Sequence, residues 1–256
     1  MIMLINQMRT DAKRCLTSYR IWLCAAVSAL LLYAVSFNVI YAMPDVISQL
    51  LISINGPSTF LIIICILPIF PFALTFAIEW EEHATSFWII RTGIKPYVLS
   101  KVIVSTLSGF MVTGLGIMFF VCIARLNLPL YTQITSGDPY VPLLENGRPL
   151  IYLLAYTTHY ALSGALAAAS ALWFSTIFPN RYMTVAAPTM LYFVFNRITA
   201  FMDIPGYLKA TYWIEGMYPA GSPEFSLLVK IATVTLICFL MGCGAIKNIE
   251  RRVLRD

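Results

Sequence analysis

Six long apolar runs, separated by shorter polar segments, make up most of this chain. A helix that crosses about 30 Å of hydrocarbon needs about 20 apolar residues, because its backbone polar groups must pair within the helix. Every run reaches about that length, and none holds more than one His, Lys, Arg, Asp or Glu. The pattern predicts an all-α, polytopic membrane protein with spans at approximately residues 20–42, 58–78, 102–124, 149–178, 182–202 and 225–246.

Prolines and small residues modify this picture inside the runs. Pro68 and Pro71 are expected to break the hydrogen-bond ladder of the second span, and Pro188 that of the fifth. Glycines cluster in the third span and small residues follow Gly164 in the fourth, where they let helix backbones approach closely. Packing within the bundle is the favoured interpretation, and an interface between protomers is the alternative.

The first 19 residues have the period of an amphipathic helix. Such a helix lies under the inner leaflet, with its apolar face toward the membrane and its basic face toward water. The alternative is a frayed tail. The predicted apolar face comprises Ile5, Met8, Ala12, Cys15, Leu16 and Tyr19, and the opposite face carries Thr10, Lys13, Arg14 and Thr17.

Residues 79–101 form a charged segment between the second and third apolar runs. The segment predicts a short helix that ends near Thr92, because Gly93 supplies a stop and Pro96 suits the first turn of the next helix. A connector alone could be much shorter, so the extra length and the aromatic pair Phe87 and Trp88 favour a docking surface. The alternative is an elbow that lies on the membrane with its aromatic side chains among the headgroups.

The composition and the charge distribution set the class and the orientation. Hydrophobic residues make up 59% of the 256 and charged residues 11%, against about 25% in soluble domains. Residues 1–256 therefore form a single transmembrane domain. If both termini are cytosolic, twelve of the 17 Lys and Arg residues lie on the inner side, including those of the tail 247–256. The net charge of +5 then reflects topology, and we expect no nucleic-acid partner.

The motifs of common enzymes are missing from the sequence. There is no G-x-x-x-x-G-K-[ST] loop for ATP, no H-E-x-x-H and no G-x-S-x-G, and the only histidines are His83 and His159. No C-x-x-C pair is present for redox chemistry or a metal. We expect no catalytic residue, no metal site and no cofactor bound by this chain.

Ionisable side chains inside spans usually face a bundle interior or a watery cavity. His159, Asn196 and Arg197 lie in the outer halves of the fourth and fifth spans if the N-terminus is cytosolic. One hypothesis is that they line the outer part of a translocation path. The other is that Arg197 extends to the headgroups while His159 bonds a neighbouring helix.

At the charged segment the chain resembles ABC transporter permeases of the type-2 export class. The resemblance is carried by the acidic residues before Thr85, by Trp88-Ile89-Ile90 and by Arg91-Thr92-Gly93-Ile94-Lys95, ending at Lys101. The resemblance extends over the whole chain, because this family also has six spans, cytosolic termini and an N-terminal interfacial helix. Two features depart from the family: Ala84 replaces a common glycine, and the stretch from Thr85 to Lys101 is about two residues shorter.

The resemblance implies a mechanism and a set of partners. Residues 79–101 would contain the cytosolic coupling helix, which fits a groove on a separate ABC ATPase subunit that binds ATP and Mg²⁺. A second copy of the permease, or a paralogue, would complete the translocation path in the bilayer of a bacterial cell membrane. The residues expected to contact the ATPase are Glu81, Glu82, Thr85, Trp88, Arg91 and Lys95.

Two other classes stay open at this point. A stand-alone secondary transporter would usually place acidic residues near the middle of the bilayer, and no Asp or Glu lies inside the apolar runs. A non-transporting scaffold or immunity subunit would bind a peptide without moving it.

Overall fold

The computed structural model describes residues 2–37, 44–55, 61–133, 137–202, 209 and 221–253. All regular elements in these ranges are helical, as the sequence predicts. Four helices are long and apolar enough to cross a membrane: α2 (Tyr19–Phe37), α7 (Ile94–Ala124), α9 (Pro149–Ile177) and α11 (Pro223–Val253). They correspond to the first, third, fourth and sixth predicted spans.

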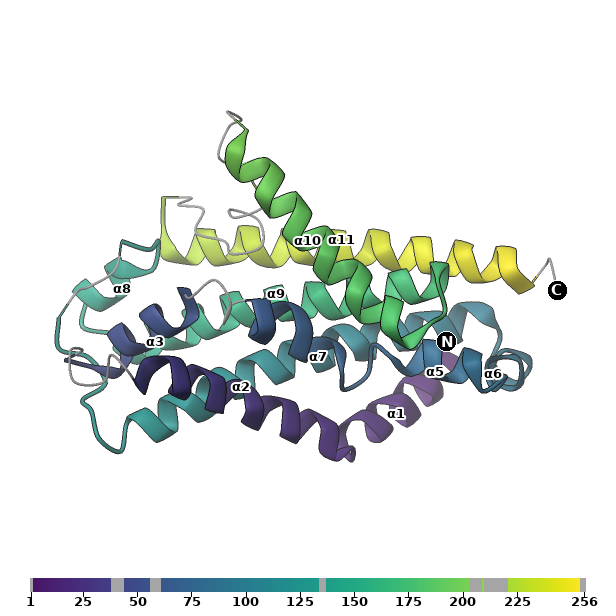
Figure 1. Ribbon diagram of the computed structural model, residues 1–256, viewed down its shortest axis with the longest axis horizontal. Coiled ribbons are helices and arrows are strands. Elements are labelled where there is room, and N and C mark those ends of the chain that lie inside the picture. Colours follow the sequence, from purple (N-terminus) through teal and green to yellow (C-terminus); the bar gives the residue numbers. More distant parts are fainter. Residues whose placement is uncertain are drawn as a thin grey trace.

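The long helix α7 runs through the centre of the body, with α2, α9 and α11 packed around it (Figure 1). Glycine lets α7 and α9 approach closely, because a Cβ added at Gly109 would lie 2.5 Å from the carbonyl oxygen of Gly164. A Cβ at Gly116 would lie 2.5 Å from the Cβ of Ser28 on α2. The predicted packing role of these small residues is confirmed for these pairs of helices.

Replacing Gly109 with alanine is expected to lower the thermal unfolding midpoint of the detergent-solubilised chain. The added methyl group meets a backbone oxygen that cannot rotate away, and overpacking of this kind costs about 1–3 kcal/mol. Gly114→Ala on the same helix is the matched control, because its Cβ would lie 3.6 Å from the Cβ of Ala161, an ordinary contact. Equal midpoints for the two variants would contradict this account of the α7–α9 contact.

The second predicted span is an irregular helical segment. Its described part begins with the π-helix η1 (Leu61–Ile66) and the 3₁₀ helix η2 (Leu67–Ile69), and α5 (Thr75–Glu81) follows after a turn. Pro68 lies in η2 and Pro71 in the turn, so the predicted break is confirmed. At Pro188 the ladder loses a donor as expected, but α10 (Arg181–Phe201) continues through this position. A proline removes one N–H, and flanking turns can preserve the helix.

The sequence did not predict the short helix α3 (Val46–Asn55). Its backbone is tied to the segment after α7, where the amides of Val46 and Ile47 donate to the carbonyls of Pro129 and Leu130 at 3.0 and 3.3 Å. Asp45 caps the helix through the amide of Ser48 at 2.8 Å. The helix α8 (Val141–Glu145) lies at the same end of the body (Figure 1).

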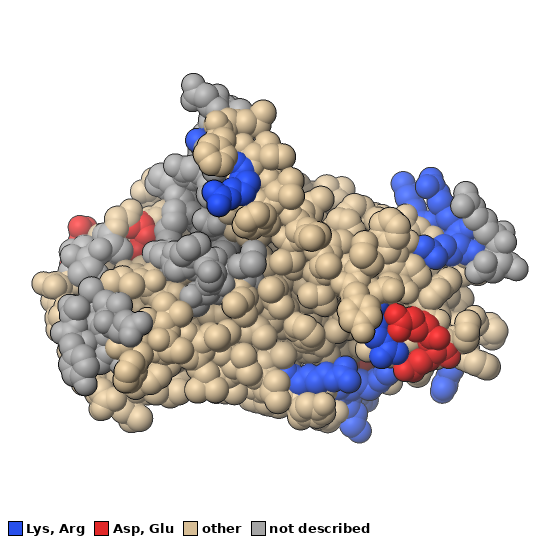
Figure 2. Space-filling view, in the orientation of Figure 1, with Lys and Arg blue, Asp and Glu red and all other residues tan. Residues whose placement is uncertain are grey.

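The N-terminus, α6 (Thr85–Thr92) and the C-terminus lie together at the opposite end, on the right of Figure 1. Lys and Arg side chains gather there, beside a patch of Asp and Glu (Figure 2). We call this end the basic end. Its exposed cations include Arg9, Lys13, Arg20, Arg91, Lys95, Arg181, Lys247 and Arg251.

The N-terminal helix α1 (Ile2–Leu16) forms as predicted and meets α2 at a bend through Thr17 and Ser18. The side that it buries against the body carries polar residues, Gln7 and Asp11, with Cys15. The apolar side chains of Ile5 and Leu16 are exposed. An apolar side facing outward beside a polar side facing inward is compatible with a helix that lies at a membrane surface.

Candidate functional site

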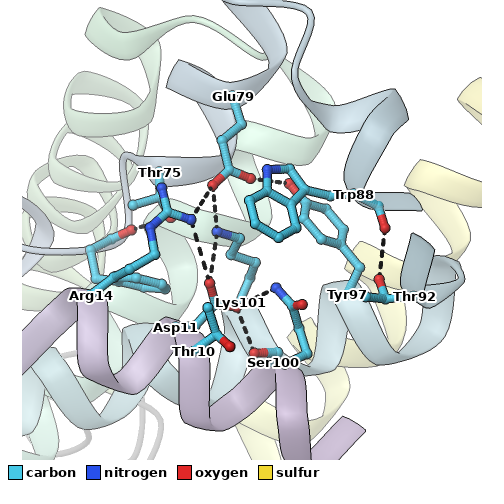
Figure 3. A network of polar contacts seen from close by, with 12 residues as sticks. Thr10, Asp11, Arg14, Thr75, Glu79, Trp88, Thr92, Tyr97, Ser100 and Lys101 are labelled. Atoms are coloured by element: carbon cyan, nitrogen blue, oxygen red, sulfur yellow. Dashed lines mark hydrogen bonds and ion pairs between the residues drawn. The ribbon is translucent and has the colours of Figure 1, made fainter. Parts of the chain in front are cut away.

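Charged side chains from α1, α5 and α7 meet inside the basic end, directly behind α6 (Figure 3). Lys101 is 1% exposed, Asp11 is 0% and Glu79 is 4%. Charged residues are almost never buried to this degree unless they are paired. The charge cluster is defined here as Asp11, Arg14, Glu79, Tyr97, Ser100 and Lys101.

Lys101 is the centre of the charge cluster. Its ammonium nitrogen lies 2.8 Å from Oε1 of Glu79 and 3.3 Å from Oδ1 of Asp11, so one cation bridges two carboxylates from different helices. The same nitrogen lies 5.1 Å from the ring centroid of Phe72 and 5.5 Å from that of Tyr97. The aromatic faces contribute a further attraction to the cation in a site without bulk water.

Each carboxylate has additional donors, which a buried charge requires. Asp11 accepts through Oδ2 from Ser100 Oγ at 2.6 Å and from Gln7 Nε2 at 3.1 Å. Glu79 accepts through Oε2 from the hydroxyl of Tyr97 at 2.7 Å. These bonds fix the rotation of both carboxylates toward Lys101.

Arg14 supplies the second positive charge. Its Nη1 lies 3.0 Å from Oε1 of Glu79 and 3.7 Å from Oδ1 of Asp11. Two cations therefore balance two carboxylates.

Glu79 stays ionised in this setting. Burial is the largest single influence and raises the pKa of the carboxyl, but the charge of Lys101 and hydrogen bonds from Lys101 and Tyr97 together outweigh it. The pKa of Glu79 consequently lies below its usual value. The ion pairs of Glu79 with Lys101 and Arg14 join α5 to α7 and α1, an arrangement that suits mechanical bracing between helices.

The charge cluster also contacts α6. The guanidinium carbon of Arg14 lies 5.7 Å from the ring centroid of Trp88, so a residue of α1 stacks on a residue of α6 and at the same time pairs with Glu79 of α5. Trp88 and Ile89 pack with Tyr97 in one apolar cluster. A displacement of α6 would thus act directly on α1, α5 and α7.

Backbone geometry fixes the two ends of α6. Gly93 ends it with φ 82° and ψ 157°, a combination open essentially to glycine alone, and α7 begins at Ile94 with Pro96 in its first turn. The predicted stop and start are confirmed. Before α6, His83 has φ 56° and the amide of Ala84 donates to the carbonyl of Glu79 at 2.8 Å, as in a Schellman ending of α5.

Gly93→Ala is expected to destabilise the chain by about 1–3 kcal/mol, because any side chain is strained at this backbone conformation. The chain could relieve this strain by shifting α6, and with it Trp88, away from Arg14. Thermal unfolding in detergent measures the loss. His83→Gly is the control from the other end of the helix, and it should leave the midpoint unchanged or raise it, since glycine adopts the left-handed region freely. An unchanged midpoint for Gly93→Ala would refute the strain argument.

The structure separates the residues expected to contact an ATPase into three groups. Thr85 is buried and Trp88 is half-buried under Arg14, whereas Arg91 and Lys95 are exposed. Glu81 and Glu82 pair with Arg181 at the start of α10, with oxygens 2.5 Å from Nε and 3.6 Å from Nη2. The acidic pair therefore joins α5 to α10 and stays accessible at the surface.

Sequence reasoning missed the most buried charges. The sequence does not single out Asp11, and it indicates Lys101 only as an inner-side cation and as the last residue of the family resemblance. Asp11 is the only acidic residue among the first 40, and Lys101 borders an uncharged run of 23 residues, so both positions offered a signal. Ile90 was also missed as a surface residue, although it is 85% exposed on α6 beside Phe87 at 77%.

His159 lies at the other end of the body, in a buried group of aromatic side chains. Its Nδ1 is 2.9 Å from the hydroxyl of Tyr140. Nearby on the same helix, the hydroxyl of Tyr152 donates to Oδ2 of Asp138 at 2.6 Å. His159 thus bonds a neighbouring segment, as the second of the two hypotheses expects.

Asn196 and Arg197 lie on α10. Asn196 donates to the hydroxyl of Tyr192 at 3.1 Å, while exposed Arg197 stacks on Phe193 at 5.7 Å. The contacts described for the three residues proposed for a translocation path lead to different partners: His159 to Tyr140, Asn196 to Tyr192 and Arg197 to Phe193.

No protein-family model, no curated protein and no solved structure matches this chain. Among the residues that the structure describes, no group of three or more His, Cys, Asp or Glu side chains could hold a metal ion.

Proposed function

We propose that this chain is the permease subunit of an ABC exporter of the type-2 class. The observation that carries the proposal is α6, a helix of eight residues at the basic end whose inner side touches the charge cluster and whose outer side is exposed. A helix presented in this way can receive a push from a partner and pass it to three other helices. The excess of Lys and Arg at this end supports a cytosolic orientation.

The contact surface proposed for the ATPase is the outer side of α6. Phe87 and Ile90 provide exposed apolar area, and Arg91 a flanking charge. Glu82 extends the surface across the turn before α6. Buried Thr85 acts from the inner side, and half-buried Trp88 connects the surface to Arg14. Lys95 lies beyond Gly93 at the edge of this surface.

A second permease copy, or a paralogue, is proposed to pack beside α10. This helix leaves the body at an angle and carries large exposed apolar side chains, including Met190, Phe193 and Phe201 (Figure 1). In a monomer such a projecting helix has little protein around it. We place the translocation path between the two copies, within the bacterial cell membrane.

Co-purification tests the proposal. The tagged chain is co-expressed with a P-loop ATPase encoded by a neighbouring reading frame, and both are extracted in mild detergent. The proposal predicts a stable complex that hydrolyses ATP and drives ATP-dependent uptake of substrate into inside-out vesicles. A chain that folds in the membrane and associates with no P-loop ATPase would contradict it.

A further inference from the structure

A long apolar groove runs along the body between α7 and α11, with α9 as its floor. Its volume is about 410 Å³, within the range of sites that hold small ligands. The walls include Leu99, Thr106 and Phe110 from α7 and Val234, Phe239 and Cys243 from α11. At its base Gly242 brings α11 close to α7, since a Cβ there would lie 3.5 Å from Cγ1 of Val102.

The length of the groove matches one leaflet of a bilayer. Leu99 and Phe110 are eleven residues apart on α7, which corresponds to about 16 Å along a helix axis. The hydrocarbon core is about 30 Å thick, so the groove covers about half of it. Leu99 lies near the start of α7 and Cys243 lies ten residues before the end of α11, so this end of the groove points toward the basic end.

Two exposed lysines lie just beyond this end of the groove. Lys95 precedes Leu99 by four residues on α7, and Lys247 follows Cys243 by four residues on α11, so each lies on the groove side of its helix, about 6 Å beyond the wall. Within the described ranges, no carboxylate oxygen comes within 4.0 Å of either ammonium. Within those ranges, one apolar groove thus ends at two cations that have no carboxylate partner.

We propose that this groove binds an anionic membrane phospholipid, with an acyl chain between α7 and α11 and the phosphate between Lys95 and Lys247. Basic openings between membrane helices on the cytoplasmic side are suited to anionic headgroups. A zwitterionic lipid would also fill the groove, but its headgroup would bring a positive charge beside the two lysines and bind less tightly. The site depends on insertion of α7 and α11 into a bilayer and does not depend on the ATPase partner.

Native mass spectrometry tests the site on the full chain without any partner. The chain is mixed with equal amounts of phosphatidylglycerol and phosphatidylcholine, and the retained lipid is measured. The chain is expected to retain phosphatidylglycerol preferentially. In the double variant Lys95→Gln, Lys247→Gln the preference should fall about 30-fold, because each cation near a headgroup contributes about 1 kcal/mol.

Two further variants complete the test. Arg9→Gln with Lys13→Gln removes the same charge from exposed positions on α1 and should leave the preference intact. Cys238→Phe places a ring in the groove and should reduce retention of both lipids. Equal retention of the two lipids by the unaltered chain, or an equal loss of preference in the α1 control, would overturn the proposal. Undiminished retention by a folded Cys238→Phe chain would overturn it as well.

Discussion

Replacing Lys101 with methionine is expected to destabilise the folded chain by about 3–5 kcal/mol, the largest effect of any single substitution considered. Methionine preserves much of the side-chain volume but leaves Asp11 and Glu79 buried with Arg14 as the one cation that pairs with them among the described residues. The docking of α1 should loosen first, since Asp11 is its buried charge. Thermal unfolding in detergent measures the loss, and limited proteolysis of the N-terminal segment locates it.

Matched variants distinguish charge imbalance from general disturbance. Lys95→Met changes an exposed lysine on the same helix and should alter the stability by no more than about 0.5 kcal/mol. Adding Glu79→Gln to Lys101→Met removes one carboxylate charge and should recover much of the stability, because Arg14 then balances Asp11 alone. If Lys101→Met unfolds at the same temperature as Lys95→Met, the charge cluster does not brace the helices.

A second large effect is expected on the surface of α6. Phe87→Asp with Ile90→Asp should abolish association with the ATPase, because both side chains are largely exposed and would have to enter an apolar contact as charges. Each carboxylate would need to be desolvated or to keep water in the interface. Co-purification and ATP-dependent uptake into inside-out vesicles are expected to fall to background.

The folding of this double variant should be unaffected, since neither side chain packs in the body. Leu126→Asp is the matched control: Leu126 is 82% exposed and lies just after α7, at the end of the body away from α6. It should leave the complex with the ATPase intact. If the double variant still binds the ATPase, the outer side of α6 is not the contact surface.

Local backbone signals in the sequence predicted local structure well. Gly93 and Pro96 fixed the boundary between α6 and α7, because each acts through its own φ angle or its own missing donor. Pro68 and Pro71 indicated the break of the second apolar run for the same reason. The amphipathic period of the first 19 residues predicted α1, although it could not show which side faces the body.

Features that depend on distant partners were not accessible to this reasoning. Asp11 is buried because Ser100 and Lys101, 89 and 90 residues further along the chain, meet it in space. In the sequence pattern of α1, Asp11 is one more polar residue next to the apolar face, and nothing nearby in the sequence predicts its burial. The helix α3 is similar: ten residues are too few for a span, and its position depends on backbone bonds from Val46 to Pro129 and on Asp45 binding Thr132.

The candidate site was predicted in outline and changed in detail. The charged segment 79–101 does contain a separate helix with an exposed side, α6, but the inner side of α6 connects it to α1 and α5, which the sequence did not indicate. Thr85 faces inward and Ile90 outward because α6 packs on Tyr97 through one side only. The surrounding fold therefore decides which residues of α6 are buried and which are exposed.

Crosslinking from α6 shows whether this helix contacts the ATPase. Ile90→Cys is introduced into a chain in which exposed Cys122 and half-buried Cys243 are replaced by serine, and membrane vesicles that contain the co-expressed ATPase are treated with a short thiol–amine crosslinker. We expect a covalent product between this chain and the ATPase, and no such product from Leu126→Cys in the same background. No product from Ile90→Cys in vesicles that hold both proteins, or an equal product from Leu126→Cys, would contradict it.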